Sequence, residues 1–259
     1  MPLPSSGQID LNDIHVEAGG SSGTQAAIND ADIRALIGKS SGVQMAFSEW
    51  YGASSAPEFV GSHSRNTSVY RLNNMVPDLS LTSISGRTSG DLVMMAFSCD
   101  GSLGSEPTVT GLTSPSVLAW DRFGVGYGVI VGTYNGTDTI EFTGGSGQTS
   151  AICVSMFSGV SSASLYGSVA TGTSGMPNPP SYVLGSGKVV YITGHLDDDL
   201  ITATAPSGYT LSNTQQASYG SRRATGMDAY DLSPASSGNP GAFGGGGSDY
   251  RAACTIILS

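Results

Sequence analysis

The sequence is poor in cysteine, in basic residues and in long hydrophobic runs, and each shortage excludes a class of protein. Its three cysteines are Cys99, Cys153 and Cys254. An odd number of cysteines without CxxC spacing argues against a disulfide scaffold and against a zinc knuckle. We therefore expect three free thiols that pack as small apolar side chains.

Basic residues number 10 against 20 acidic ones, which gives a formal charge of −10. Residues 1–54 hold 6 acidic and 2 basic side chains, and residues 55–259 hold 14 and 8. Such a chain lacks the basic footprint that binds nucleic acid, and anionic membranes repel it. No run of 18 apolar residues occurs, so we expect no membrane insertion. The opening MPLPSSGQIDLND has no basic n-region and no apolar h-region, so we also expect no signal peptide.

The residue types that are abundant in the sequence favour β structure. The chain contains 37 Gly and 12 Pro, and 39% of its residues are hydrophobic. These numbers predict a packed core built from short strands and turns rather than from long helices.

A short motif recurs three times near the N-terminus with a spacing of 17 residues. It is visible at Leu11, Ile28 and Met45. Each unit predicts a short strand followed by a short helix, and one of these units buries too little surface to fold alone. Residues 1–54 therefore predict a small docking module of short helices and strands. The docking residues assigned to it are Leu11, Ile14, Ile28, Ile33, Leu36, Ile37, Met45, Trp50 and Tyr51.

A longer repeat runs through the rest of the chain. GDLVMMAFSCD (90–100) matches GKVVYITGHLD (187–197), and QTSAICVSMFSGV (148–160) matches DYRAACTIILS (249–259). Four strands in each half predict a mainly β fold, an antiparallel two-sheet jelly-roll-like sandwich over residues 55–259. The connection between the halves is expected in 167–187, and residues 57–85 are expected to supply strands that cover a sheet edge.

These segments carry a resemblance to a known class of protein. QIDLNDIHVEAGG, INDADIRALIGKSSG and MAFSEWYGAS resemble the N-terminal segment of structural proteins of tailed bacteriophages, where a similar string precedes a β-rich domain. The resemblance covers residues 5–54, and the β domain is similar to sandwich domains of phage tail and virion proteins. It implies a virion component, assembled in the host cytoplasm, whose partners are other virion proteins contacted through residues 1–54. Such proteins occur on tails and on heads.

The search for catalytic chemistry assigns no catalytic residue and no cofactor. GGSSG (19–23) matches a nucleophile elbow but follows no apolar strand, so we interpret it as a turn. HLDDD (195–199) gathers His195, Asp197 and Asp199 as weak candidates for a cation site, but it lacks the alternating oxygens of an EF-hand loop. The internal alignment pairs Asp100 with Asp197, yet catalytic carboxylates come from distant strands and cannot be paired from sequence.

Aromatic side chains in polar turns are the best candidates for recognition, because a ring can stack on a sugar while its polar edge hydrogen-bonds. Tyr219, next to Arg222 and Arg223 in a polar turn, is the least core-like of them, so these three residues are candidate glycan contacts.

Three functions are compatible with this sequence. We favour a tail fibre or baseplate appendage, not an enzyme, that docks by its N-terminus and presents the sandwich to host-surface glycans. The first alternative is a capsid decoration protein without a receptor site. The second is a carbohydrate-active depolymerase, for which no catalytic constellation is visible. Because closed symmetry strengthens weak docking contacts, we expect a homotrimer.

Overall fold

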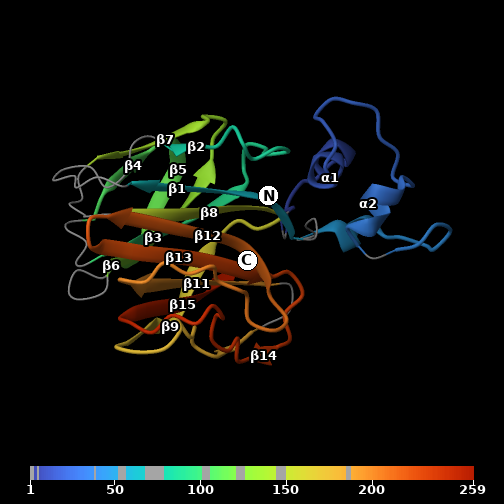
Figure 1. Cartoon of the computed structure of the whole chain (residues 1–259). Helices are drawn as coiled ribbons and strands as arrows, with labels where there is room; N and C mark the ends of the chain where they lie inside the picture. The colour runs from blue at the N-terminus through green and yellow to red at the C-terminus, as the bar shows by residue number, and fades with distance from the viewer. Residues whose placement is uncertain are drawn as a thin grey trace.

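The structure, a computed structural model, describes residues 3–4, 6–37, 39–51, 57–67, 79–100, 106–120, 126–143, 150–184 and 188–259. It is mainly β, with antiparallel sheets packed together and a few short helices at the N-terminus (Figure 1). The predicted mainly β class, with antiparallel sheets packed together after a few short N-terminal helices, is confirmed. Among the described residues, no helix is long and apolar enough to span a bilayer.

Two five-stranded antiparallel sheets form the sandwich. The first sheet has the order β1 (Glu58–Thr67), β8 (Ser150–Ser158), β3 (Leu92–Cys99), β6 (Gly126–Tyr134), β5 (Leu112–Trp120). The second sheet has the order β12 (Thr210–Tyr219), β13 (Arg222–Asp231), β11 (Val189–Asp197), β15 (Arg251–Leu258), β9 (Ala163–Gly172).

Two smaller sheets cover the outer faces of the sandwich. One has the order β2 (Leu79–Ser80), β7 (Thr139–Thr143), β4 (Thr108–Thr110), and the other pairs β10 (Tyr182–Val183) with β14 (Ser237–Gly238). The first covers the outer face of the first sheet, where Leu79, Ile140 and Phe142 join its core. The loops around β10 and β14 do the same for the second sheet through Tyr182 and Phe243.

This layering explains why the two repeated strands read as continuous apolar runs. Every residue of β3 and of β11 is buried, because each strand lies at the centre of its sheet and packs on both faces. Met94 and Tyr191 face the space between the sheets, whereas Met95 and Ile192 face outward into the covering layers.

The long repeat is a structural duplication. Strands β1, β8, β3, β6 and β5 of the first sheet correspond in order to β9, β15, β11, β13 and β12 of the second. Cys153 pairs in register with Ala96 and Cys254 with Thr193, so the two cysteines occupy equivalent places, as the alignment predicts. All three cysteines are free and buried.

The connectivity differs from a jelly roll, because each half of the repeat forms its own sheet instead of alternating between the two. The predicted connection over 167–187 is also wrong at its start, since β9 occupies Ala163–Gly172. This strand is half-exposed and rich in small polar residues, so its sequence lacks a clear alternation. β1 and β2 lie within 57–85, and β1 forms an edge of the first sheet as expected.

The two sheets face each other with β3 across from β11 and β1 across from β12. The β1–β12 side is closed by side chains that bond the opposite backbone. Ser62 Oγ donates to the carbonyl of Ser212 at 3.1 Å, and Asn66 Nδ2 donates to that of Gln216 at 2.7 Å.

The sandwich has two distinct ends. We define the base as the end where β1, β3, β9 and β11 begin, near Glu58 and Ala163. The tip is the opposite end, where β3 and β11 finish and the β12–β13 hairpin turns. Because β1 spans ten residues at about 3.3 Å each, base and tip lie about 30 Å apart.

The N-terminal residues form a separate small core. Each 17-residue unit contributes one helix: α1 (Leu11–Glu17), α2 (Ala31–Ala35) and the 3₁₀ helix η1 (Phe47–Trp50). The strands expected in these units are absent from the described residues before Tyr51, because the segments between the helices form turns and extended chain without ladder partners. The buried residues of this core are Leu3, Ile9, Ile14, Ile33 and Trp50.

Local hydrogen bonds fix this module. Asp10 and Asp13 form a reciprocal capping box on α1, and the Trp50 indole donates to the carbonyl of Ile33, its counterpart 17 residues earlier, at 3.2 Å. Arg34 is buried and donates to the backbone carbonyls of Ser40 and Val43. The repeat therefore places the equivalent residues Ile33 and Trp50 in contact.

Candidate functional site at the tip of the sandwich

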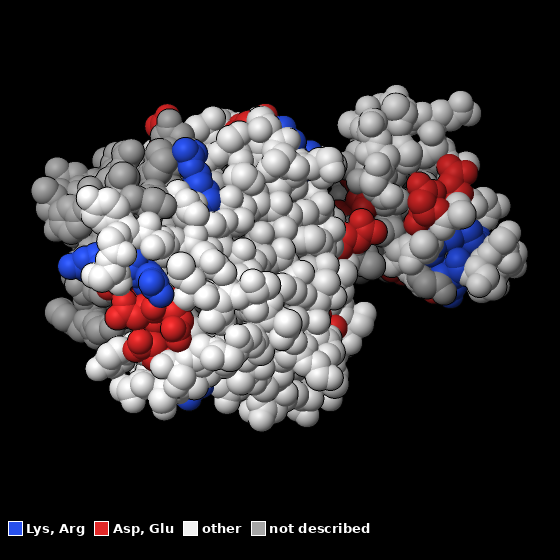
Figure 2. Space-filling model, in the orientation of Figure 1, with Lys and Arg blue, Asp and Glu red and all other residues white. Residues whose placement is uncertain are grey.

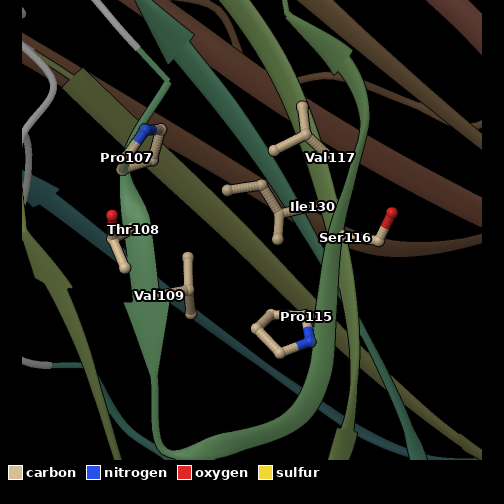
Figure 3. Close-up of a pocket in the computed structure, with 7 residues that line it drawn as sticks. All are labelled: Pro107, Thr108, Val109, Pro115, Ser116, Val117 and Ile130. Atoms are coloured by element: carbon tan, nitrogen blue, oxygen red, sulfur yellow. The ribbon is translucent and has the colours of Figure 1, made fainter.

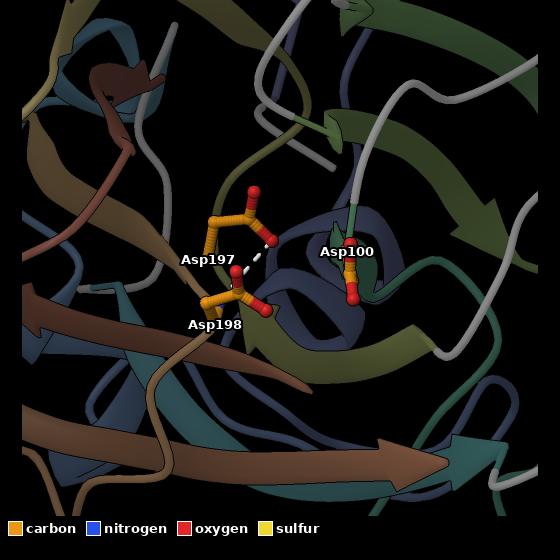
Figure 4. A group of neighbouring side chains, drawn as sticks. All are labelled: Asp100, Asp197 and Asp198. Atoms are coloured by element: carbon orange, nitrogen blue, oxygen red, sulfur yellow. Dashed lines mark hydrogen bonds between the residues drawn. The ribbon is translucent and has the colours of Figure 1, made fainter. Parts of the chain in front are cut away.

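Three carboxylates meet at the tip. The C-terminal ends of β3 and β11 bring Asp100, Asp197 and Asp198 together, and one carboxylate oxygen from each lies within 4.8 Å of the others (Figure 4). Asp100 and Asp197 are equivalent residues of the duplication, so the facing of the two central strands explains why they meet. Figure 2 shows an acidic patch at the end of the sandwich opposite the N-terminal helices.

The cluster has an unusual electrostatic setting. Asp197 is 8% exposed, and burial, together with the charges of Asp100 and Asp198, raises its pKa to about 7. Burial and the charge of Asp198 also raise the pKa of Asp100, while Arg222 opposes the shift. Arg222 Nη1 lies 3.8 Å from Asp100 Oδ1, too far for a strong ion pair.

The β12–β13 hairpin brings the predicted glycan contacts to this same end. Tyr219 pairs with Arg222 across a turn that contains Gly220, whose φ is +63°. The Asp198 backbone N–H donates to the carbonyl of Arg223 at 2.9 Å, which ties the acidic turn to the hairpin. Tyr219 is 49% exposed, so its ring is available to a ligand.

A second aromatic residue, Tyr250, reaches the tip from the bend directly before β15. The Tyr250 carbonyl accepts from the Asp197 backbone N–H at 2.8 Å, and the Tyr250 side chain is 49% exposed. Leu200, also exposed, follows the acidic turn. The tip thus combines carboxylates, guanidinium groups and exposed rings, the groups from which sugar-binding surfaces are built.

The weak cation candidates of HLDDD separate in the structure. Asp197 belongs to the cluster, but Asp199 accepts the Ser248 backbone N–H with Oδ2 and is not one of its three members. His195 is fully buried, and burial lowers its pKa to about 3, which leaves a neutral imidazole.

Between the two sheets lies a second group of buried polar residues. Asp228 Oδ2 accepts from Ser155 Oγ at 2.5 Å and from the Tyr191 hydroxyl at 2.8 Å, which links one sheet to the other. Asp228 is completely buried, and burial raises its pKa to about 6. These residues have no access to solvent, so their role is structural.

The docking residues predicted in the module fall into three groups. Ile14, Ile33 and Trp50 are buried, and Leu11, Leu36, Ile37 and Met45 pack on them while partly exposed. Ile28 is 39% exposed and Tyr51 37%. Further exposed apolar side chains in the module are those of Val16, Val43 and Phe47.

A shallow apolar pocket of about 170 Å³ lies elsewhere, between β4 and β5 (Figure 3). Its described lining residues carry no charged side chain and no imidazole. They are Pro107, Thr108, Val109, Pro115, Ser116, Val117 and Ile130. This pocket therefore offers no group for acid–base chemistry.

Sequence reasoning missed Tyr250 as a member of the tip, whereas Asp198 lies within the HLDDD segment that it singled out. The internal alignment of Asp100 with Asp197 could have predicted the carboxylate cluster, because equivalent residues on the two central strands meet when the halves pack face to face. Compared with protein-family models, with curated proteins and with solved structures, the chain matches none.

Proposed function

We propose that this protein is a structural component of a bacteriophage virion, a tail fibre or baseplate appendage that attaches to host-surface glycans. The docking surface is the N-terminal module, and the attachment surface is the tip. The protein acts by binding and not by turnover, and it assembles as a homotrimer.

One observation carries this proposal: the module and the tip are at opposite ends. Seven residue-to-residue steps of about 3.5 Å each lead from Tyr51 to Glu58 at the base, so the module lies within about 25 Å of the base (Figure 1). An appendage anchored through the module then points Tyr219, Tyr250 and the acidic cluster away from its anchor.

The module also has the surface expected of an anchor. Five large apolar side chains, those of Val16, Ile28, Val43, Phe47 and Tyr51, are 37% to 47% exposed within a segment of about 50 residues. Among the residues that the structure describes in the much larger sandwich, the exposed ones are equal in number, namely Val183, Leu200, Leu211, Tyr219 and Tyr250. Concentrated exposed apolar surface favours a protein–protein interface.

The glycan test uses purified protein and polysaccharide from a candidate host. We expect adsorption without new reducing ends or unsaturated products. Tyr219→Ala and Arg222→Ala should weaken adsorption about tenfold, whereas Tyr51→Ala, an exposed tyrosine of the module, should leave it unchanged. If multivalent display yields no adsorption, capsid decoration without receptor binding replaces this proposal.

A second candidate function, glycan hydrolysis, is favoured by the raised pKa of Asp197 beside Asp100. Glycosidases pair a carboxylic acid of raised pKa with a carboxylate. Depolymerisation in the same assay, abolished by Asp197→Asn, would establish that function instead.

The location and the oligomeric state are tested separately. Immunogold labelling of intact particles should place this protein on the tail, and labelling of the head would favour the decoration alternative. Sedimentation at micromolar concentration should give a trimer, and a monomer would contradict this part of the proposal.

A further inference from the structure

The carboxylate cluster at the tip has the geometry of a cation site. Two oxygens that bind one calcium ion at about 2.4 Å each lie at most about 4.8 Å apart. The three oxygens of Asp100, Asp197 and Asp198 satisfy this limit simultaneously. All three side chains offer oxygen ligands only, which is the preference of a hard cation.

The charge of this cluster is poorly balanced by its neighbours. Asp249 adds a fourth negative charge that acts on Asp197, and the ion pair described for the cluster is the 3.8 Å contact of Asp100 with Arg222. That arginine side chain is 42% exposed, so solvent screens most of its effect. Like charges held this closely are costly unless one carboxyl group takes up a proton or a cation lies between them.

A second, independent observation comes from two buried polar residues that precede the cluster on the central strands. Ser98 Oγ and both ring nitrogens of His195 have no hydrogen-bond partner among the described residues, although Ser98 is 1% and His195 0% exposed. Each precedes its aspartate, Asp100 or Asp197, by two residues on a central strand. Residues two apart in a strand face the same side, so these polar groups face the same inter-sheet space as the carboxylates.

Buried polar groups without a protein partner usually bond ordered water or another ligand. The residues in register with His195 on the two flanking strands are Gly226 and Ala252, and neither has a polar side chain that could bond its ring. The tip therefore holds three carboxylates, and buried polar groups without a protein partner precede two of them on the central strands.

We propose that Asp100, Asp197 and Asp198 bind a calcium ion at the tip, with water completing its coordination and bonding Ser98 and His195 behind it. Calcium is preferred to magnesium because it takes six to eight oxygen ligands in flexible geometry, whereas magnesium requires a near-ideal octahedron. The site joins the two halves of the duplication, since Asp100 belongs to one half and Asp197 and Asp198 to the other. The proposal does not depend on glycan binding or on a virion origin.

The test uses the full chain after treatment with a chelator and dialysis at pH 7.5. Calorimetric titration with CaCl2 should show binding near one ion per chain, and millimolar CaCl2 should raise Tm by several degrees more than MgCl2 does. Asp198→Asn, at an exposed position, should weaken calcium affinity at least about tenfold, because ligand charge sets affinity in such sites. Glu141→Gln, an exposed acid on β7, is the matched control and should bind calcium like the wild type.

Asp197→Asn separates an ion site from a merely structural role. Without calcium its Tm should equal or exceed that of the wild type, because one repelling charge is removed, while its calcium-dependent rise in Tm should be lost. Should this variant not fold, Asp198→Asn still decides by titration. Absence of calcium binding by the wild type, or an unchanged affinity in Asp198→Asn, would overturn the proposal.

Discussion

At the scale of single residues, the structure places its most perturbed acids where the two halves of the duplication meet. Asp197 lies at the open end of this contact and Asp228 in its interior, and the pKa of each is raised by burial. A carboxyl group whose pKa is raised on folding binds its proton more tightly in the folded state. Its favourable contribution is therefore complete at low pH and is lost as the pH rises.

The variant Asp228→Asn tests this pH dependence of stability at the buried position. The asparagine oxygen still accepts from Ser155 and Tyr191, but the charge is gone. The wild-type contribution is complete below about pH 4 and is lost as the pH rises through the folded pKa of about 6. Between pH 4 and 7 the free energy of unfolding of the wild type should therefore fall more than that of Asp228→Asn, by on the order of 2 kcal/mol.

Urea unfolding at several pH values measures this difference. Asp197 shifts stability in the same direction in both proteins, so only the difference between wild type and variant reports on Asp228. Parallel pH profiles for the two proteins would contradict the expected burial of a titrating carboxyl.

At the scale of elements, close packing of β13 against β3 sets the spacing of the sheets. A Cβ atom on Gly226 would lie 2.8 Å from Ser98 Oγ and 3.3 Å from its Cβ. A Cβ atom essentially never lies within 3.0 Å of another heavy atom, so Ser98 or its strand must shift to admit a methyl group. A glycine is required here for the approach of a facing sheet and not for a turn.

Gly226→Ala should destabilise the sandwich by about 1–3 kcal/mol, the usual cost of overpacking a core. Thermal or urea unfolding of the full chain measures the loss. Adding Ser98→Gly removes the colliding side chain, so the double variant should recover part of the stability that Gly226→Ala loses. Equal stability of Gly226→Ala and the wild type would show that the sheets are not held at this distance.

The elements also show which features could be predicted from sequence. The apolar runs of β3 and β11 and the spacing of the cysteines predicted a duplicated two-sheet sandwich. β9 was missed because an edge strand half-exposed to solvent needs no apolar alternation. In α1, the 17-residue spacing places Val16 at the position of Ile33 and Trp50, yet Val16 is 44% exposed and Ile14 is buried instead.

The candidate site was predictable only in pieces. Tyr219, Arg222 and Arg223 stood out by composition, and Asp197 by its acidic neighbours. Whether these residues meet Asp100 and Tyr250 depends on how the two sheets face each other. That arrangement is decided by pairing between strands that are distant in the sequence. A single sequence records that pairing only through the internal repeat.

At the scale of the whole molecule, the module and the sandwich have separate hydrophobic cores. The module core draws on residues between Leu3 and Trp50, while the sandwich clusters begin at Phe59. Interactions within each part therefore dominate its stability.

Deleting residues 1–54 should leave a folded sandwich that no longer enters particles. Circular dichroism and thermal unfolding should show β structure with a Tm within a few degrees of that of the full chain, and particles assembled with this truncated protein should lack it by immunoblot. Full-length protein carrying Glu141→Gln serves as an incorporation control. Normal incorporation of the truncated protein would contradict a docking role for the module.

The separation of the two halves into two sheets also bears on how the chain folds. Every ladder of the first sheet lies within residues 58–158, so this sheet can form before the second half has been synthesised. Until then its inner face, with Met94, Val129 and Val131, has no cover. Nascent chains should therefore pass through an intermediate that exposes apolar surface and is prone to aggregate, and folding is complete only when the second sheet closes over that face.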